Sequence, residues 1–179
     1  SYKLEIVRDD NPMDPREWDN IGTMACWHKR YRLGDVQPGE TPEEYLEKLS
    51  EDYLSEKEKV NIRRMRDIID SWWYYANSAG RIRLEKLEQE IEKIQKQALD
   101  REFLIFPLYL YDHSGTTMST APFPYKWDSG QVGFIYVSRE KTSEEFPGAS
   151  DDRIYEFLRN EVNEYARYLE GDCWGWVIT

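Results

Sequence analysis

Two matched apolar repeats in the middle of the chain constrain its fold more than any other feature. Each repeat has intervals of three and then four residues, which places its apolar side chains on one face of a helix. The two repeats are offset by one residue, and the break between them falls at residues 77–80. The pattern predicts a helical hairpin with Gly80 ending the first helix, and one long helix with a stutter is the alternative. The repeats are Ile62, Met65, Ile69, Trp72 and Ala76, followed by Leu84, Leu87, Ile91, Ile94 and Ala98.

The two apolar stripes allow two interpretations. In the first, which we favour, the helices are antiparallel and their stripes pack against each other. In the second, part of the hairpin remains uncovered and residues 56–98 form the seam of a homodimer. Upstream, Thr41 is expected to cap a helix that has Pro42 at its first position and Glu44 completing a capping box.

Strand-like segments flank the helical region. Residues 2–7 alternate and are expected to face a core on one side, whereas residues 13–36 are expected to form an ordered loop. Residues 103–111, 116–120, 131–138 and 173–178 also resemble strands, and Pro107 suggests an edge or a bulge. Residues 151–170 are expected to form a helix that Gly171 ends. The sequence therefore predicts one α+β domain over residues 1–179. It is an antiparallel sheet with a helical-hairpin insertion at about 41–99 and one C-terminal packing helix.

The charge is acidic and concentrated. The chain has 35 acidic and 24 basic residues, a net charge of −11, and residues 40–59 and 140–179 carry −5 and −6 of it. Such a chain is not expected to bind nucleic acid directly. The acidic blocks are either solvated helix faces or surfaces that attract a basic protein partner. The candidate partner-binding residues are Glu40, Glu43, Glu44, Glu47, Glu51, Asp52, Glu144, Glu145, Asp151, Asp152 and Glu156.

The composition also limits where the protein acts. The longest apolar run, residues 103–111, is too short to span a bilayer, and no basic leader with an apolar core opens the sequence. Two cysteines do not form a disulfide scaffold. We therefore expect a cytoplasmic location, no membrane partner and no cofactor. Trp18 and Trp127, each followed by an aspartate, suit either a protein-binding surface or the edge of a core.

A small set of residues offers an enzymatic or metal-binding alternative. Cys26, His28, His113 and Cys173 match the number of ligands in a tetrahedral zinc site, but Cys26 and His28 are not spaced as a usual chelating pair, so no metal is expected. Asp112-His113-Ser114 brings together the residue types of a catalytic relay, with Cys26 as a possible nucleophile. Consecutive residues on an extended chain point to opposite faces, however, and a turn favours the same residue types.

Three stretches outside the helical region contain a distinctive group of motifs. The first comprises Asn11-Pro12, Pro15-Arg16-Glu17-Trp18-Asp19-Asn20, Gly22-Thr23-Met24 and Cys26-Trp27-His28. The second comprises Leu108-Tyr109-Leu110-Tyr111-Asp112-His113-Ser114-Gly115 and Met118-Ser119. The third comprises Trp127-Asp128-Ser129-Gly130-Gln131-Val132-Gly133 and Val137-Ser138.

Together these motifs resemble a family of small proteins carried by phages and mobile elements of Gram-positive bacteria. The size and acidity of the chain also resemble those of type II-A anti-CRISPR proteins, which inhibit Cas9. The resemblance implies a non-enzymatic inhibitor of host defence in a bacterial cell. Its partner would be a Cas9-type nuclease with guide RNA, whose positively charged DNA-binding channels an acidic protein can occupy. A small enzyme using Cys26, His28 and His113 and an assembly protein acting through its helices remain the alternatives.

Overall fold

The computed structural model describes residues 2–113, 115–125 and 127–179. The chain divides into two compact units, one formed by Ser1–Gly39 with Leu104–Thr179 and the other by Glu40–Phe103. The fold is α+β, as the sequence predicts. Each unit has its own buried apolar cluster.

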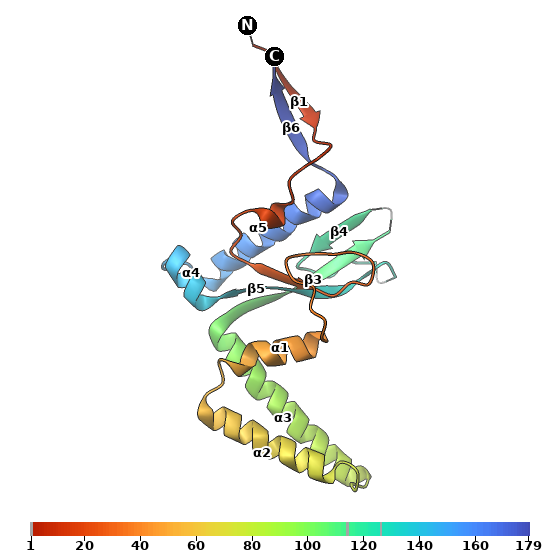
Figure 1. Cartoon of the computed structure of the whole chain (residues 1–179), viewed down its shortest axis with the longest axis vertical. Coiled ribbons are helices and arrows are strands. Elements are labelled where there is room, and N and C mark those ends of the chain that lie inside the picture. Colours follow the sequence, from red (N-terminus) through yellow and green to blue (C-terminus); the bar gives the residue numbers. More distant parts are fainter. Residues whose placement is uncertain (1, 114, 126) are drawn as a thin grey trace. The chain divides into compact units, whose positions relative to one another are not determined.

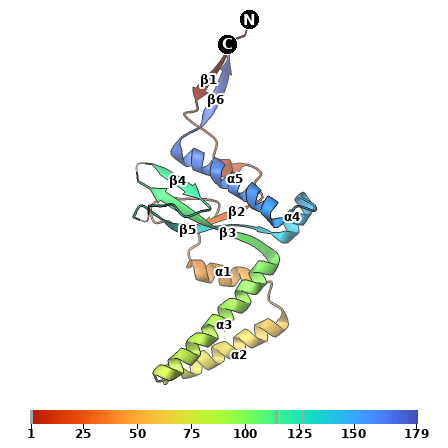
Figure 2. The ribbon, with the colours of Figure 1, turned by 180° about the vertical axis from the view of Figure 1, so that it is seen from behind.

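The first unit contains a four-stranded sheet with the strand order β2-β5-β3-β4. These strands are β2 (Thr23–Cys26), β5 (Ser129–Ser138), β3 (Phe103–Asp112) and β4 (Thr116–Ser119). Helix α5 (Asp151–Glu170) packs along one face of this sheet, and both views show it there (Figures 1 and 2). β3 is an inner strand rather than an edge, but Pro107 precedes the part of β3 that pairs with β4.

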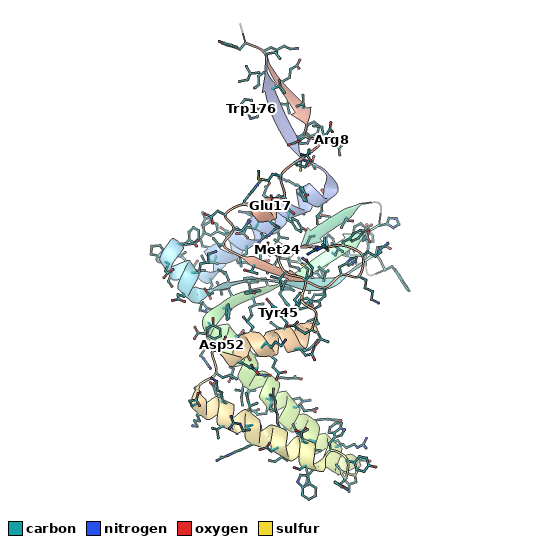
Figure 3. The ribbon with its side chains drawn as sticks, viewed as in Figure 1. Arg8, Glu17, Met24, Tyr45, Asp52 and Trp176 are labelled. Carbon is teal, nitrogen blue, oxygen red and sulfur yellow. The ribbon has the colours of Figure 1, made fainter. Side chains whose placement is uncertain are left out.

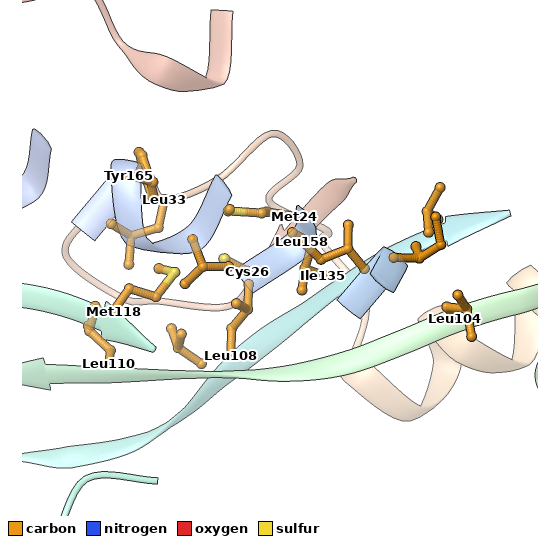
Figure 4. Packing of buried hydrophobic residues seen from close by; sticks show 14 residues of the cluster. Met24, Cys26, Leu33, Leu104, Leu108, Leu110, Met118, Ile135, Leu158 and Tyr165 are labelled. Atoms are coloured by element: carbon orange, nitrogen blue, oxygen red, sulfur yellow. The ribbon is translucent and has the colours of Figure 1, made fainter. Parts of the chain in front are cut away.

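The core of this unit lies between the sheet and α5 (Figure 4). Leu158 of α5 is fully buried, and so are Leu108 and Ile135 from β3 and β5. The backbones of β2 and β5 approach each other closely at Gly133, where a Cβ atom would lie 2.0 Å from the carbonyl oxygen of Ala25. Only glycine allows that approach.

A second sheet has two strands, β1 (Leu4–Arg8) and β6 (Trp174–Ile178), which pair antiparallel (Figure 1). We call this pair of strands the ribbon. The expectation that residues 2–7 face a core on one side is wrong, because every residue of β1 is exposed. The described strands form two sheets rather than the one antiparallel sheet expected, because among them β1 and β6 pair only with each other.

The second unit is helical, with α1 (Pro42–Glu51), α2 (Glu56–Trp72) and α3 (Ser78–Glu102). The predicted capping box of α1 is present. The predicted hairpin is also present, and Ile62 and Met65 of α2 pack with Ile91, Ile94 and Ala98 of α3.

The hairpin turn differs from its prediction in two details. Gly80 does not end the first helix, because α2 ends at Trp72 and Gly80 lies in the first turn of α3, where its N–H donates to the capping residue Asn77. Trp72, expected on the buried stripe, is 61% exposed.

Three elements lie where no helix or strand is predicted. β2 and the short 3-10 helix η1 (Pro15–Glu17) form within residues 13–36, and α4 (Arg139–Glu145) directly follows β5. The helix over residues 151–170 and its end at Gly171, which has a φ of 69°, agree with the sequence prediction.

Candidate functional site

The first acidic block, which surrounds α1, is partly used by the helical unit itself. The carboxylate of Glu44 accepts a hydrogen bond from the Thr41 N–H at 2.9 Å, as part of the capping box. Glu40 pairs with Lys48 at 3.0 Å, and Glu47 pairs with Arg66 of α2. These carboxylates stabilise their own unit, so reversing their charge would disturb local structure as well as any surface.

The other three predicted partner-binding residues of this block are exposed and make no ion pair within the described part of the chain. They are Glu43, Glu51 and Asp52, the last of which is labelled in Figure 3. An open groove of about 550 Å³ lies beside Glu51 and Asp52 and is also lined by Arg63 and Arg66 of α2. Asp67 and Asp70 also line this groove, so its α2 side carries both basic and acidic side chains.

The second acidic block is similarly divided. Asp151 binds Arg139 through two guanidinium nitrogens at 2.9 and 3.1 Å, and Glu156 pairs with Arg153 at 2.7 Å. Glu145 lies 3.7 Å from Lys141. Asp151 and Asp152 occupy the first turn of α5, where carboxylates complement the helix dipole.

Ion pairs within each unit thus leave only some of the predicted partner-binding carboxylates free. Of those predicted in the second block, Glu144 and Asp152 are exposed and make no ion pair among the residues described. The two blocks belong to different units, the first within Glu40–Phe103 and the second within Leu104–Thr179.

Cys26, the suggested nucleophile, is buried in the core of the first unit and 1% exposed. Burial, together with the nearby charge of Asp35, raises the pKa of its thiol to about 12, although Arg16 acts in the opposite direction. A thiol with that pKa remains protonated at neutral pH, and the thiolate is the form that attacks or binds metal. The geometry does not favour Cys26 as a nucleophile or ligand.

His28 is held in a turn just after β2. Its Nδ1 accepts hydrogen bonds from the backbone N–H groups of Arg30 and Tyr31 at 3.3 and 3.1 Å, and its ring stacks on Tyr31 with the centroids 4.8 Å apart. These contacts assign His28 a structural part in the turn that carries Arg30. A role in proton transfer would have to use Nε2.

His113 lies at the mouth of the turn that follows β3. Its Nδ1 is 3.4 Å from a carboxylate oxygen of Asp128, and its side chain is exposed. The neighbouring Asp112 pairs with Arg30, so the suggested relay is not assembled from Asp112. Ser114, the third residue of that motif, lies outside the described residues.

An open polar cleft of about 450 Å³ lies beside these residues and is lined by side chains that include His28, Arg30, Asp112 and Asp128. Neither Cys26 nor Cys173 lines it. In the part of the chain that the structure describes, no group of three or more His, Cys, Asp or Glu side chains is arranged to hold a metal ion.

A buried ion-pair network links three segments of the first unit, and sequence reasoning did not find it. Arg16, whose side chain is 5% exposed, donates to Asp35 at 2.9 and 2.6 Å and to Glu161 of α5 at 3.1 Å. Asp35 accepts the Met24 N–H, and Glu161 accepts the Ile21 N–H, each at 2.7 Å.

Desolvation lowers the pKa of Arg16, but hydrogen bonds and charge from Asp35 and Glu161 outweigh it and raise that pKa above its ordinary value. The network therefore joins the segments that contain Arg16 and Asp35 to α5. Glu161 lies within the acidic block of residues 140–179, but its carboxylate is used by these internal bonds. Among the sequence motifs, Arg16 and Gly22 pointed to this region, but nothing linked them to Glu161.

The two tryptophans predicted beside aspartates have different surroundings. Trp127 is 99% exposed, and Trp18 is half-exposed. Trp18 lines an open apolar groove of about 370 Å³ with Phe146 and Phe157, and Glu161 and Glu164 also lie along it.

No family model, curated protein or solved structure matches this chain. Among the described residues, no helix is both long and apolar enough to cross a membrane.

Proposed function

We propose that the protein is a non-catalytic inhibitor that occupies a basic surface of a host-defence nuclease, with a Cas9-type nuclease and its guide RNA as the expected partner. The observation that carries the proposal is that five of the predicted partner-binding carboxylates are exposed and make no ion pair among the residues described. They are Glu43, Glu51 and Asp52 in the helical unit and Glu144 and Asp152 in the other unit.

These carboxylates suit binding to a basic surface because no internal partner has to be displaced first. A paired carboxylate such as Asp151 would lose its bond to Arg139 on binding, which offsets part of any gain. Unpaired carboxylates attract a distant positive surface and raise the rate of association, and salt weakens that attraction.

The charge of its nucleic-acid-binding channels is the reason for expecting a Cas9-type nuclease as the partner. Such a nuclease holds nucleic acid in positively charged channels, and a protein bearing carboxylates competes for those channels without any catalysis. A metal-binding or thiol mechanism receives less support, because the thiol of Cys26 is buried and protonated at neutral pH.

The experiment measures DNA binding and cleavage by a purified Cas9–guide RNA complex with increasing amounts of the full-length chain. Inhibition is expected, and it should weaken as the salt concentration rises from about 0.1 to 0.5 M. Absence of binding and of inhibition at a large excess over the nuclease would reject this partner.

Two charge-reversal variants test the surfaces separately. The first replaces Glu43, Glu51 and Asp52 with lysine, and the second replaces Glu144 and Asp152. We expect at least one of them to weaken inhibition tenfold or more, since each lysine also introduces repulsion.

Matched controls change the net charge equally in the same unit but outside the acidic blocks. The control for the first variant replaces Glu85, Glu88 and Glu92 of α3, which are exposed. The control for the second replaces Glu17 and Asp19. If variants and controls lose inhibition equally, overall charge rather than these surfaces is responsible, and the proposal is wrong.

A further inference from the structure

The ribbon has one face made almost entirely of apolar side chains. Its register pairs Leu4 with Ile178, Ile6 with Trp176 and Arg8 with Trp174, and residues directly opposite each other in a β-ladder point to the same face. This apolar face therefore comprises Leu4, Ile6, Trp174, Trp176 and Ile178, with Arg8 at one end. The opposite face, with Glu5, Val7, Gly175 and Val177, is mixed and contains smaller side chains.

All five apolar side chains of this face are exposed to water, with exposed fractions between 56 and 73%. Trp176 projects from the middle of the ribbon in Figure 3. A contiguous apolar patch of this kind is characteristic of an interface. A two-stranded ribbon alone is only marginally stable in water, and covering its apolar face makes it more stable.

The base of the ribbon is nevertheless well anchored to the end of α5. The Arg8 guanidinium donates to the carbonyl oxygen of Gly171 at 2.9 Å, and the Asp9 N–H donates to that of Cys173, also at 2.9 Å. The Trp174 indole N–H is held by Asp172 at 2.8 Å. These hydrogen bonds hold the base of the ribbon in place. Its apolar face is therefore a defined surface on two paired strands rather than a frayed end of the chain.

The charge of the ribbon does not oppose association with a second copy. Residues 2–8 contain two basic and one acidic side chain, and residues 173–179 contain none of either kind. Two copies of a protein with a net charge of −11 repel each other overall, but residues 2–8 and 173–179 together carry a net charge of +1 and add nothing to that repulsion. The same net charge disfavours docking on an anionic membrane.

We propose that the apolar face of the ribbon binds the same face of a second copy of this chain, forming a two-fold symmetric dimer. The two-fold axis runs along the strands, so β1 of one copy lies over β6 of the other. Leu4 then faces Ile178 of the second copy, Ile6 faces its Trp176, and Arg8 faces its Trp174. Each indole then meets an aliphatic side chain or the Arg8 guanidinium, which is a favourable partner for an aromatic ring.

The area of the face is consistent with a weak specific dimer. Its two indoles and three aliphatic side chains offer about 500 Å² per copy, or about 1,000 Å² in total. This total lies at the lower limit for a specific interface, so we expect a dissociation constant between about 1 and 100 μM. The proposal does not depend on the proposed function, because no residue of the acidic surfaces takes part.

The test is sedimentation of the full chain between about 1 and 200 μM. We expect a monomer–dimer equilibrium in this range, and Trp176→Thr and Ile6→Thr should each raise the dissociation constant at least tenfold. Threonine retains the preference for a strand, and circular dichroism checks that each variant is folded. The matched control is Trp127→Thr, which removes an equally large exposed indole from another part of the same unit and should leave the dimer unchanged.

Several outcomes would overturn the proposal. A monomer at 200 μM excludes the dimer, and a dimer insensitive to Trp176→Thr places the interface elsewhere. A dimer lost on Trp72→Thr but not on Trp176→Thr assigns it to the 56–98 helices. A monomer that binds phosphatidylcholine–phosphatidylglycerol vesicles through Trp176 makes the face a membrane contact.

Discussion

Met24 in the four-stranded sheet and Trp176 in the ribbon are both large apolar side chains in antiparallel strands, but Met24 is fully buried and Trp176 is 68% exposed. The difference lies in what covers each sheet. Helix α5 packs its apolar face on the four-stranded sheet, whereas no described residue covers the apolar face of the ribbon. Alternation along a strand determines which side chains share a face, and a covering element determines whether that face is buried.

The largest expected effect tests the covered sheet. Leu158→Ala removes a fully buried side chain between α5 and the sheet, and should lower the free energy of unfolding by about 3–4 kcal/mol through lost burial and a cavity. Chemical denaturation at low protein concentration measures it. Ile6→Ala in the exposed ribbon is the matched control and should cost less than about 0.5 kcal/mol. If both variants lose the same free energy of unfolding, the four-stranded sheet and the ribbon do not differ in burial as described.

The second prediction concerns alkaline pH. Burial raises the pKa of Tyr165 from 10.0 to about 12 and that of Cys26 from 9.0 to about 12. Both groups are neutral when protonated, so their contribution to stability is complete below about pH 9. It is lost as the pH rises through the folded-state values, by up to about 1.4 kcal/mol per pH unit for each group.

Denaturation at pH 8, 9.5 and 11 measures this loss, which we expect to reach about 1–3 kcal/mol at pH 11. Tyr165→Phe should flatten the dependence above pH 10, although it also removes the hydroxyl that accepts the Gly34 N–H. Trp176→Thr in the ribbon should leave the dependence unchanged. An unaltered slope in Tyr165→Phe would mean that Tyr165 does not titrate with unfolding.

The smallest effect is expected where α5 joins the ribbon. Gly171 has a φ of 69°, and a Cβ there would lie 3.2 Å from the Arg8 guanidinium. Gly171→Ala should cost about 1 kcal/mol, because a side chain is strained in the left-handed region, and should weaken the dimer by displacing Arg8.

Thermal unfolding and sedimentation measure these two effects. Gly148→Ala, at a φ of 82° with open space around the new Cβ, should have a similar cost but leave the dimer unchanged. If Gly171→Ala changes neither the thermal stability nor the dimer, the connection between α5 and the ribbon tolerates a residue with a side chain.

The sequence predicted elements whose signals are local. The capping box of Thr41 and Glu44, the paired helical stripes and the helix end at Gly171 are all present. β2 was missed because its four residues show no periodic signal within a stretch rich in aromatic side chains. The exposure of β1 was missed because alternation does not reveal whether a face is covered.

The candidate site was less predictable, because it depends on which side chains meet. Acidic composition identified Glu47 and Asp151 but not their partners Arg66 and Arg139. The bond between Arg16 and Glu161 joins residues 145 positions apart, and no local pattern specifies such a pair. Only the structure therefore shows which of these acidic side chains form ion pairs and which do not.

The Arg16–Glu161 bond also affects the order in which the chain folds during synthesis. At about 5–20 residues per second, a ribosome makes Glu161 about 7–29 s after Arg16. The contacts of the helical unit lie within Glu40–Phe103, so that unit can form in that interval. Until α5 is made, Met24 and Leu33 lack the helix that helps to bury them, so residues 13–36 complete their packing only at the end of synthesis.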